Sequence, residues 1–582
     1  MNLKCDCNSL RSKTKTNLGL GLLALMVCFG SQLSLANSST IIKLEVDNIF
    51  QSTVTGTVVD SEGVPLPGAN VIEKGTTNGT QTDFDGNFSL EVADDATLVI
   101  SYIGFLTQEV AVDGQSSINV QLGEDSAQLD EVIVTGYQTE TKRETTAAVS
   151  IVKAEELAAI PSGNVEQQLQ GRVAGVTVLS NGQPGTTSQI RVRGFGAFGG
   201  NEPLYVVDGV PVNNTEFLNP DDIETTTVLK DAAAASIYGA RAANGVVVYS
   251  TKQGSKTKRR TTMSLNISSG VTDPNSGGAP QNMNPLDMAR YTHIAYENNA
   301  AANGTAVQYS HPQYGSNPTP VFPDYLHADG QNGVSASEIN LAEIQANYAA
   351  DPENVFLIRP NLRGTNWYKA LTRIAPLSRF SLGFDGGNEN GRFYVGISAQ
   401  TQAGILLNND FERYTARFNS EWDVAPWLSI GENFQVTYRS VVGGFGGQGG
   451  VEGADDESVI LSAYRMPTII PVRDEFGSFA STRAAGFNNP RNPVRQQTLN
   501  AGDDKAYGIG GFGNFYVLIK PVESLTFRSS LGGGYSNSHN VNYNFRYLGD
   551  SEPEASNSFS EGSSYSFNWT FTNTLAYEEL FG

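Results

Sequence analysis

The sequence predicts a mainly β protein that consists of a small β-sandwich, a compact α/β unit and a long antiparallel sheet. Two observations support this prediction. Glycine (61 residues), tyrosine (23) and phenylalanine (28) are abundant while charged residues make up only 17% of the chain, which favours strands over long helices. Polar and apolar residues also alternate with a period of two over much of the stretch after residue 255.

The first 36 residues have the composition of a secretory signal peptide. Four basic residues precede an apolar stretch at 18–29, and small residues follow at 34–36. A membrane anchor helix is the alternative, but spanning a bilayer takes about 20 apolar residues. All three cysteines lie in this leader, so the mature chain has no disulfide, no cysteine–zinc site and no cysteine nucleophile.

Residues 52–123 predict the β-sandwich, because around seven short strands alternate with turns there. The pattern Asp83-x-Asp85-Gly86 has the beginning of a calcium loop. The other acids of such a loop, including its final glutamate, are absent. We therefore expect a plain β-turn at this position.

A polar tether at 124–144 contains the apolar triplet Val132, Ile133 and Val134. An extended apolar triplet between polar flanks suits the addition of a strand to the exposed sheet edge of another protein. An ordinary edge strand of the next domain would have the same pattern. The residues alone leave both interpretations open.

The α/β unit spans 145–255. We expect helices at 153–160, 163–173 and 231–239, and strands at 175–180, 189–194, 203–212, 223–230 and 245–252.

Within this unit, Gly194, Gly196 and Gly199 spell G-x-G-x-x-G after a strand, and an acidic pair follows at 221–222. This spacing is that of a dinucleotide-binding fingerprint. The fingerprint requires a helix after the glycines, whereas this chain continues as a strand, "NEPLYVVDGVPV". We interpret the glycines as a tight turn and exclude a nucleotide site.

Charge and motif content argue against the other chemistries. With 38 basic and 60 acidic residues the chain has a formal net charge of -22, which disfavours nucleic acid as a partner. No sequence motif of a serine hydrolase or zinc protease occurs, and the four histidines, all in expected loops, lack metal-ligand spacing. They are His293, His311, His327 and His539. The sequence thus predicts no catalytic residues, no metal, no cofactor and no enzyme.

The last part of the chain predicts membrane-spanning strands. In "SSYSFNWTFTNTLAY" an apolar face alternates with serine, asparagine and threonine; that face consists of Tyr565, Phe567, Trp569, Phe571, Leu575 and Tyr577. In a soluble sandwich such a face turns inward. In an outer-membrane barrel it faces lipid, and the polar face lines the lumen.

Strand and connection lengths favour the barrel. We expect about eight strands, near 259–270, 378–386, 391–402, 412–424, 427–440, 505–519, 524–537 and 563–578. Most are long enough for a tilted membrane-spanning strand, which needs about 9–11 residues. Tight turns alternate with connections that are mostly long, at 271–377, 441–504 and 538–562, as in outer-membrane barrels; 403–411 is short.

The order of these parts, together with several long motifs, resembles the SusC/RagA family of TonB-dependent outer-membrane transporters. The motifs include "LDEVIVTGYQ", "IRVRGFGAFGGNEPLYVVDGVPV" and "VLKDAAAASIYGARAANGVVVYSTKQG". The resemblance implies a signal peptide at 1–36, a carboxypeptidase-regulatory-like sandwich at 52–123, a tether with the TonB box at 124–144, a plug domain at 145–255 and the N-terminal portion of a transmembrane antiparallel β-barrel at 256–582.

The resemblance also implies site residues. The segment that contacts TonB would be Asp130, Glu131, Val132, Ile133, Val134, Thr135 and Gly136. The residues that match the plug motifs of the family are Arg191, Arg193, Gly194, Gly196, Asp208, Gly209, Tyr238, Gly239, Arg241, Asn244 and Gly245.

The implied function is active import of an oligosaccharide or oligopeptide through the outer membrane of a Bacteroidetes-type Gram-negative cell, with the N-terminal domains in the periplasm. The implied partners are TonB with its inner-membrane energising complex, a SusD-like surface lipoprotein and outer-membrane lipids. A siderophore or cobalamin receptor and a non-transporting surface-binding module are the alternatives.

Family barrels of this type close with about 22 strands. Eight strands would leave an open edge in lipid, at several kcal/mol for each unpaired backbone group. We therefore expect the chain to be an N-terminal fragment of a longer protein.

Overall fold

The computed structural model describes residues 51–579, apart from 77, 103–104, 124–131, 136–137, 142–147, 159–162, 181, 197–199, 257–258, 279–280, 329–330, 444–458, 488–490, 501–503 and 551–552. The expected signal peptide therefore lies outside the described residues. The chain divides into two units, Met1–Gln128 and Leu129–Gly582, and each is described by itself.

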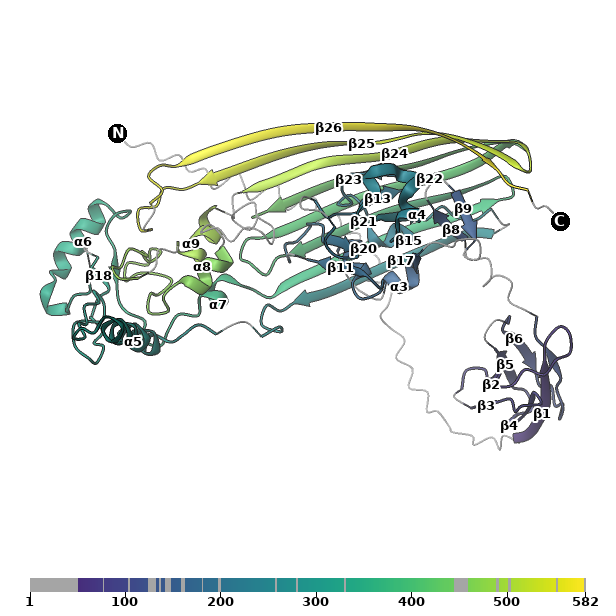
Figure 1. Ribbon diagram of the computed structural model, residues 1–582, viewed down its shortest axis with the longest axis horizontal. Helices are drawn as coiled ribbons and strands as arrows, with labels where there is room; N and C mark the ends of the chain where they lie inside the picture. Colours follow the sequence, from purple (N-terminus) through teal and green to yellow (C-terminus); the bar gives the residue numbers. More distant parts are fainter. Residues whose placement is uncertain are drawn as a thin grey trace, which may run out of the picture. The chain divides into compact units, whose positions relative to one another are not determined.

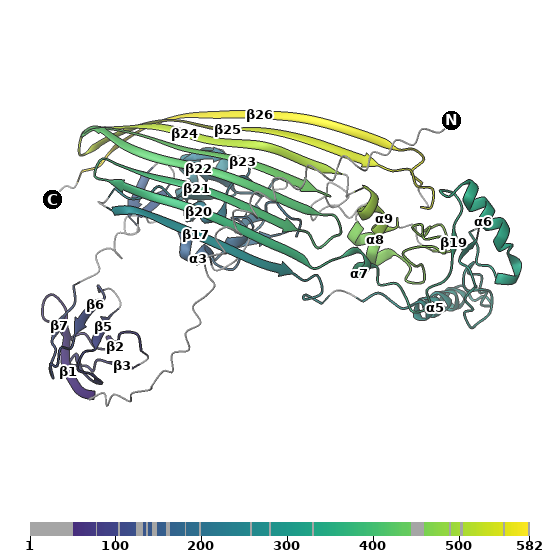
Figure 2. The same cartoon turned by 180° about the vertical axis from the view of Figure 1, so that it is seen from behind.

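The first unit is a two-layer β-sandwich. Its strands are β1 (Gln51–Val59), β2 (Asn70–Glu73), β3 (Gly79–Gln81), β4 (Asn87–Ala93), β5 (Thr97–Ser101), β6 (Gln108–Ala111) and β7 (Val120–Gln121). They form the sheets β4-β1-β7 and β3-β2-β5-β6 (Figure 2). Alternate residues such as Val54, Val58, Leu98 and Ile100 are completely buried between the layers. The expected sandwich of about seven strands is confirmed.

The turn at Asp83 is a plain β-turn, as expected. The Asp83 carboxylate accepts hydrogen bonds from the backbone N–H groups of Asp85 (3.0 Å) and Asn87 (2.8 Å). Gly86 has a φ of 74°, in the left-handed region that glycine tolerates.

The second unit begins with a two-stranded sheet, β8 (Val132–Thr135) and β9 (Gln138–Thr141), followed by the α/β unit. The central sheet of the α/β unit has the order β10-β15-β16-β13-β14. Its strands are β10 (Val149–Lys153), β13 (Leu204–Val207), β14 (Val210–Val212), β15 (Ile223–Leu229) and β16 (Val246–Thr251). A separate hairpin consists of β11 (Val176–Leu179) and β12 (Gln189–Val192), and the helices are α3 (Ala154–Ala158), η2 (Gln167–Leu169), η3 (Pro220–Asp222), α4 (Ala232–Ala235) and η4 (Ser236–Ala242).

Two expectations for the α/β unit are wrong. The helix expected at 163–173 is only the single turn η2, and Gly171 (φ 74°) and Gly175 (φ 78°) turn the chain in the left-handed region. The strand expected at 203–212 is the hairpin β13–β14, because both Asp208 (φ 47°) and Gly209 (φ 84°) have the positive φ of a tight hairpin turn.

The rest of the unit is dominated by an eight-stranded antiparallel sheet, here called the wall sheet, with the order β17-β20-β21-β22-β23-β24-β25-β26. Its strands are β17 (Arg259–Thr272), β20 (Ala375–Asn388), β21 (Gly391–Ala403), β22 (Asp410–Ala425), β23 (Leu428–Val442), β24 (Lys505–Val522), β25 (Leu525–Asn544) and β26 (Ser558–Tyr577). All eight expected strands are present. Because β25 continues to Asn544, His539 lies on a strand and not in a loop as expected.

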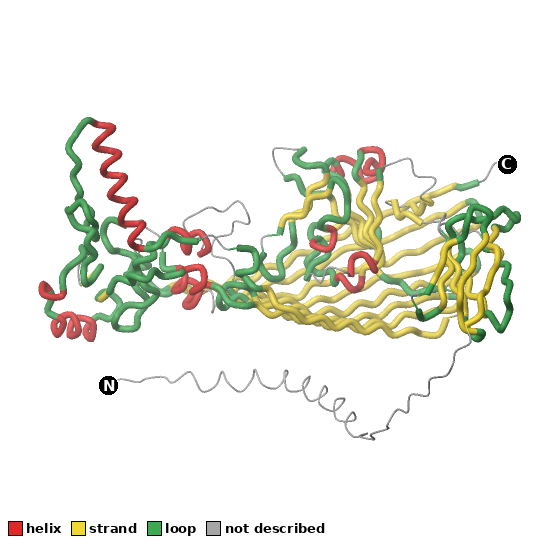
Figure 3. Tube along the Cα trace, turned by 90° about the horizontal axis from the view of Figure 1, so that it is seen from below, coloured by secondary structure: helices red, strands yellow, loops and turns green. Residues whose placement is uncertain are grey.

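The two faces of the wall sheet have opposite polarity. On β22, Arg413, Thr415 and Arg417 are buried, whereas the alternate residues Tyr414 and Phe418 are exposed. The α/β unit lies against the polar face (Figure 3). A soluble sandwich would bury its apolar face, so this arrangement is that of an outer-membrane barrel wall with a polar lumen.

The long connections of the wall sheet gather at one end of its strands, and the tight turns lie at the other end (Figure 1). These connections contain α5 (Pro285–Asn303), β18 (His327–Ala328), η5 (Ala336–Glu338), α6 (Leu341–Ala350), β19 (Leu357–Ile358), α7 (Trp367–Leu371), α8 (Val459–Arg465), α9 (Pro493–Arg495) and η6 (Gln496–Asn500). They share an apolar core around the fully buried Trp367, Tyr314 and Leu371. Within the described residues, no helix is both long and apolar enough to cross a bilayer.

Candidate functional site

The predicted TonB-box segment lies in the two-stranded sheet of β8 and β9, where Val132 pairs with Thr141 and Thr135 with Gln138. Asp130, Glu131 and Gly136 lie outside the described residues. In a two-stranded sheet each strand has one edge without a strand neighbour among the described residues. A partner that adds a strand would pair with the backbone of that edge. The contact with TonB itself stays a prediction.

Ala148, the first described residue of the α/β unit, is fixed by a hydrogen bond to Asp231. The N–H of Ala148 donates to the carboxylate of Asp231 at 2.6 Å. The same carboxylate caps α4 by accepting the N–H of Ala234 at 2.8 Å. These hydrogen bonds hold the pKa of Asp231 below its usual range, and the one from Ala234 has the larger effect on the pKa.

The two predicted plug motifs meet in space. The Asn244 side chain donates to the backbone oxygen of Gly200 at 2.9 Å, and the N–H of Gly196 donates to Asn201 at 3.0 Å. Arg193 (φ 59°) and Gly194 (φ 88°) turn the chain out of β12 in the left-handed region. The strands on either side of this turn belong to different sheets, since β12 pairs with β11 and β13 with β16.

The other predicted motif residues build the same corner of the fold. The Arg191 guanidinium lies 4.0 Å from the centroid of the Phe195 ring, a cation–π contact. Tyr238 is buried, Gly239 (φ 68°) interrupts η4, and Arg241 on η4 is exposed. Gly245 (φ 88°) directly precedes β16, and a Cβ atom there would lie 3.1 Å from Val192. Gly199 lies outside the described residues.

Buried ion pairs join the α/β unit to the wall sheet. Arg417 on β22 lies 3.4 Å from Asp208 and 3.7 Å from Asp222. Asp222 also accepts a hydrogen bond from the Tyr394 hydroxyl at 2.8 Å. Nearby, Arg379 on β20 lies 2.8 Å from Asp221. We call these two arginines and three aspartates the acid–arginine lock.

Hydrogen bonds from wall side chains to backbone oxygens of the α/β unit continue along the wall sheet beside the lock. Arg413 donates to the backbone oxygens of Gly163 (3.0 Å) and Glu216 (3.1 Å). Asn419 donates to that of Lys252 at 2.7 Å, and Asn514 to that of Asp208 at 3.0 Å. The α/β unit is thus held through its backbone as well as through its carboxylates.

Sequence reasoning did not find the lock. Asp221 and Asp222 were the acids of the rejected nucleotide fingerprint, and their partners lie 158 or more residues further along the chain. The available signal is the charge of the inward positions of β22. Arginines at 413 and 417 face the lumen side of a strand that is otherwise uncharged between them.

Burial is the main influence on the pKa of two carboxyl groups of the α/β unit, Asp222 and Glu166. It raises the pKa of Asp222, against the opposing effects of the Arg417 guanidinium and the Tyr394 hydroxyl. Burial also raises the pKa of Glu166 to about 7, and Thr215 donates a hydrogen bond to this carboxyl group. No cluster of three or more metal-ligating side chains is found in the part of the chain that the structure describes.

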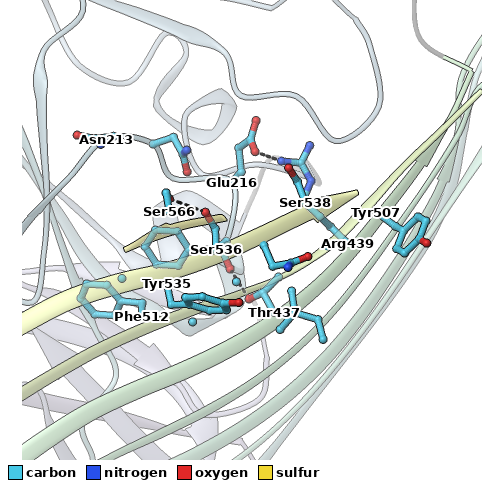
Figure 4. A pocket seen from close by; sticks show the side chains of 18 of the residues that line it. Asn213, Glu216, Thr437, Arg439, Tyr507, Phe512, Tyr535, Ser536, Ser538 and Ser566 are labelled. Carbon is cyan, nitrogen blue, oxygen red and sulfur yellow. Dashed lines mark hydrogen bonds and ion pairs between the residues drawn. The ribbon is translucent and has the colours of Figure 1, made fainter. Parts of the chain in front are cut away.

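A cavity of about 430 Å³ lies where the segment after β14 meets β23 to β26 (Figure 4). Asn213, Glu216 and Phe217 line it from the α/β unit, and hydroxyl groups of the wall sheet line it opposite. The Phe217 ring stacks on the buried ring of Phe512 with centroids 5.4 Å apart. Glu216 forms an ion pair with Arg439 at the edge of this cavity.

Comparisons with known proteins agree with the predicted resemblance. Residues 141–246 match the TonB-dependent receptor plug domain, and residues 54–134 match the CarboxypepD_reg-like domain. TonB-dependent receptor P39 of Formosa agariphila is 32% identical over 490 residues, which are 84% of this chain and 41% of that receptor. TonB-dependent receptor SusC of Bacteroides thetaiotaomicron is 33% identical over 528 residues, which are 85% of this chain and 45% of that receptor.

Among solved structures, the RagAB peptide importer in its open-open state superimposes with a TM-score of 0.58 at 26% identity, over 77% of this chain and 47% of that chain. The chain spans less than half the length of the curated relatives it matches. Over most of its length, then, the chain is a relative of the SusC-like TonB-dependent receptors, which are not enzymes, and it contains the plug and CarboxypepD_reg-like domains that its sequence predicts.

Proposed function

We propose that this protein imports an oligosaccharide or oligopeptide across the outer membrane with energy supplied through TonB. The observation that carries the proposal is the wall sheet, whose apolar face is exposed while its polar face binds a folded plug domain through the acid–arginine lock. Such a wall needs lipid on one side and an occluded aqueous passage on the other. The similarity to SusC and to the RagAB peptide importer supports the same role.

The site of energy input is the segment from Asp130 to Gly136, which TonB would bind by strand addition to β8. A pull on this segment reaches the plug domain at Ala148, where the chain enters β10. Because β10 is antiparallel to β15, Ala148 lies at the Leu229 end of β15 and the lock residues Asp221 and Asp222 lie at its other end. The force therefore shears the β10–β15 pair and is transmitted along β15 to the lock.

The domain boundaries 52–123, 124–144, 145–255 and 256–582 fit this role, with the first two parts and the plug reached from the periplasm. Lipids would contact the exposed apolar face of the wall sheet. A SusD-like lipoprotein would bind at the end of the wall strands that lies away from the tight turns. There the long connections form a folded layer with its own core. The exposed residues Leu286, Tyr291 and Ile294 of α5 offer that partner an apolar contact.

The test is uptake by cells that produce the full chain. We would follow fluorescently labelled neutral oligosaccharides and peptides, each about four to eight units long, into the periplasm. Deletion of 130–136 should abolish uptake, and deletion of the neighbouring 124–129 should leave it unchanged. Uptake that persists without 130–136, or surface binding without uptake in any variant, would overturn the proposal in favour of a passive pore or a surface-binding module.

A further inference from the structure

The cavity between the plug domain and the wall sheet has the chemistry of a carbohydrate site, and we propose that it binds an uncharged oligosaccharide. This inference rests on the proposed import function and names its substrate class. Its volume, about 430 Å³, lies within the range of about 300–1,000 Å³ that is typical of small-molecule sites. It is formed by two elements that import must separate, the plug segment after β14 and strands β23 to β26.

The wall side of the cavity carries several neutral hydrogen-bonding groups. Strand alternation places Thr437, Ser536 and Ser566 on the lumen face. Thr437 donates to the plug backbone at Phe217 (3.2 Å), and the Ser536 and Ser566 hydroxyls pair at 2.8 Å. Asn568 on the same face accepts the N–H of Gly534 at 2.7 Å, and none of the described residues accepts a hydrogen bond from its amide N–H groups, which a ligand could use. Hydroxyl and carboxamide groups both donate and accept, which matches the hydroxyls of a sugar.

The cavity has no net charge. Glu216 and Arg439 are the charged residues of its lining, and they neutralise each other in an ion pair. A peptide brings two charged termini and a ferric catecholate siderophore brings an anionic complex, and both would need an unpaired opposite charge in a partly desolvated site. An uncharged glycan has no such requirement.

Three glycines line the cavity from β24 and β25, namely Gly508, Gly510 and Gly534. Gly510 lies between Thr437 and Ser536, its partners on the neighbouring strands. A side chain at Gly510 would find no atom closer than 3.9 Å, so the space in front of this residue is open. A flat ring can approach the backbone at Gly510 closely, and the half-buried Phe217 offers an aromatic surface to the apolar C–H face of a pyranose.

The first test is binding to the full chain in detergent, measured by calorimetry. The probes are neutral malto-, xylo- and manno-oligosaccharides of four to eight units, oligogalacturonates of the same length, and alanine- or lysine-based pentapeptides. We expect at least one neutral series to bind, and the charged glycans and peptides to bind at least tenfold more weakly. Binding of peptides or uronates alone, or of no neutral series, overturns the inference.

A matched pair of variants locates the site. Gly510→Leu fills the cavity from the lumen face of β24. Gly513→Leu adds the same side chain to the lipid face of the same strand, outside the cavity lining, where the nearest atom is 3.6 Å away. We expect Gly510→Leu to weaken oligosaccharide binding at least tenfold and Gly513→Leu to leave it unchanged. Equal effects of the two variants would show that sugars bind elsewhere.

The ion pair gives a second, independent readout. Glu216→Gln removes the carboxylate that neutralises Arg439, so oligogalacturonate binding should rise at least tenfold while neutral binding changes little. No gain for the uronate overturns the assignment of Arg439 to the ligand site. If peptides are taken up in a TonB-dependent manner and no sugar binds, the import function stands and only the carbohydrate inference fails.

Discussion

The guanidinium of Arg417 lies 3.4 Å from the carboxylate of Asp208, with the arginine side chain 0% and the aspartate side chain 2% exposed. Arg417 comes from the wall and Asp208 from the hairpin turn of the plug domain. Thr251 fixes the aspartate by donating both its N–H (2.9 Å) and its hydroxyl (2.8 Å) to it. Two charges without solvent contact are tolerated only while they are together, so plug and wall cannot part here without rehydrating both.

Removal of the arginine should therefore loosen the plug domain strongly. Arg417→Met leaves Asp208 and Asp222 buried without their cation, which costs about 3–5 kcal/mol. We expect a corresponding loss of hydrogen-exchange protection in β15 and β16. The control is Arg546→Met, which breaks the exposed pair with Glu353 (2.6 Å) and should cost no more than about 1 kcal/mol. Similar losses in both variants would contradict a special role for burial.

Glu166 should make the stability of the plug domain fall as pH rises. Its pKa is about 7 in the folded protein, above the ordinary value of 4.5. Between these two values the folded protein holds a proton that the unfolded chain has released, so stability decreases by up to about 3 kcal/mol across this window and levels off above pH 7. Glu166→Gln should remove this decrease and be the more stable protein at pH 8.

The measurement is urea unfolding of the plug domain in the full chain at pH 4, 6 and 8. The control is Glu156→Gln on the exposed side of α3, which should leave the pH dependence unchanged. A wild-type stability that increases from pH 5 to pH 7 would show that the Glu166 carboxyl is not buried as described.

The wall strands could be predicted because lipid and lumen impose strict alternation on them. The same rule fails for local structure in the plug domain. Val165, Leu169 and Val173 have helical spacing and are all buried, yet turns at Gly171 and Gly175 bring them to the core without a helix beyond η2. The spacing of apolar residues therefore predicts which residues are buried. It does not predict the backbone conformation that brings them into the core.

The candidate site could be predicted only in part. Motif residues such as Gly194 and Asn244 were identified, but the hydrogen bond of the Asn244 side chain to the Gly200 carbonyl depends on how two sheets meet. The lock depends on pairing across more than 150 residues, such as that of Asp221 with Arg379. A single sequence shows that these residues are charged, but it contains no signal for which arginine pairs with which aspartate.

The β-sandwich gives a test in aqueous solution, because residues 51–123 form a core of their own. A methyl group at Gly56 would lie 1.8 Å from the backbone oxygen of Ile118, in the segment before β7, which the hydrogen bond from the Ile118 N–H to the Thr55 oxygen (2.8 Å) holds against β1. Gly56→Ala should therefore abolish cooperative thermal unfolding of this domain. Gly63→Ala, at a φ of 85° with open space around it, should cost only about 1 kcal/mol. A Gly56→Ala domain as stable as the Gly63→Ala domain would contradict the strand packing.

A disulfide between plug and wall would test whether the plug must leave the wall during import. Val210 and Gly532 are suitable positions, since a Cβ atom built at Gly532 would lie 2.3 Å from a γ-carbon of Val210. Such an approach brings the two Cβ atoms into the range of about 3.5–4.5 Å that a disulfide spans. Val210→Cys with Gly532→Cys should abolish uptake under oxidising conditions, keep oligosaccharide binding, and recover uptake after reduction.

The matched control joins two wall strands and leaves the plug free. Ser530 and Thr572 pair across β25 and β26, on the same face of the sheet and outside the cavity lining. Ser530→Cys with Thr572→Cys should form a disulfide without any effect on uptake, because no plug contact is fixed. Unchanged uptake through the oxidised Val210–Gly532 pair would mean that this plug–wall contact persists during transport and that the substrate passes elsewhere, since a disulfide cannot lengthen to let the two surfaces separate.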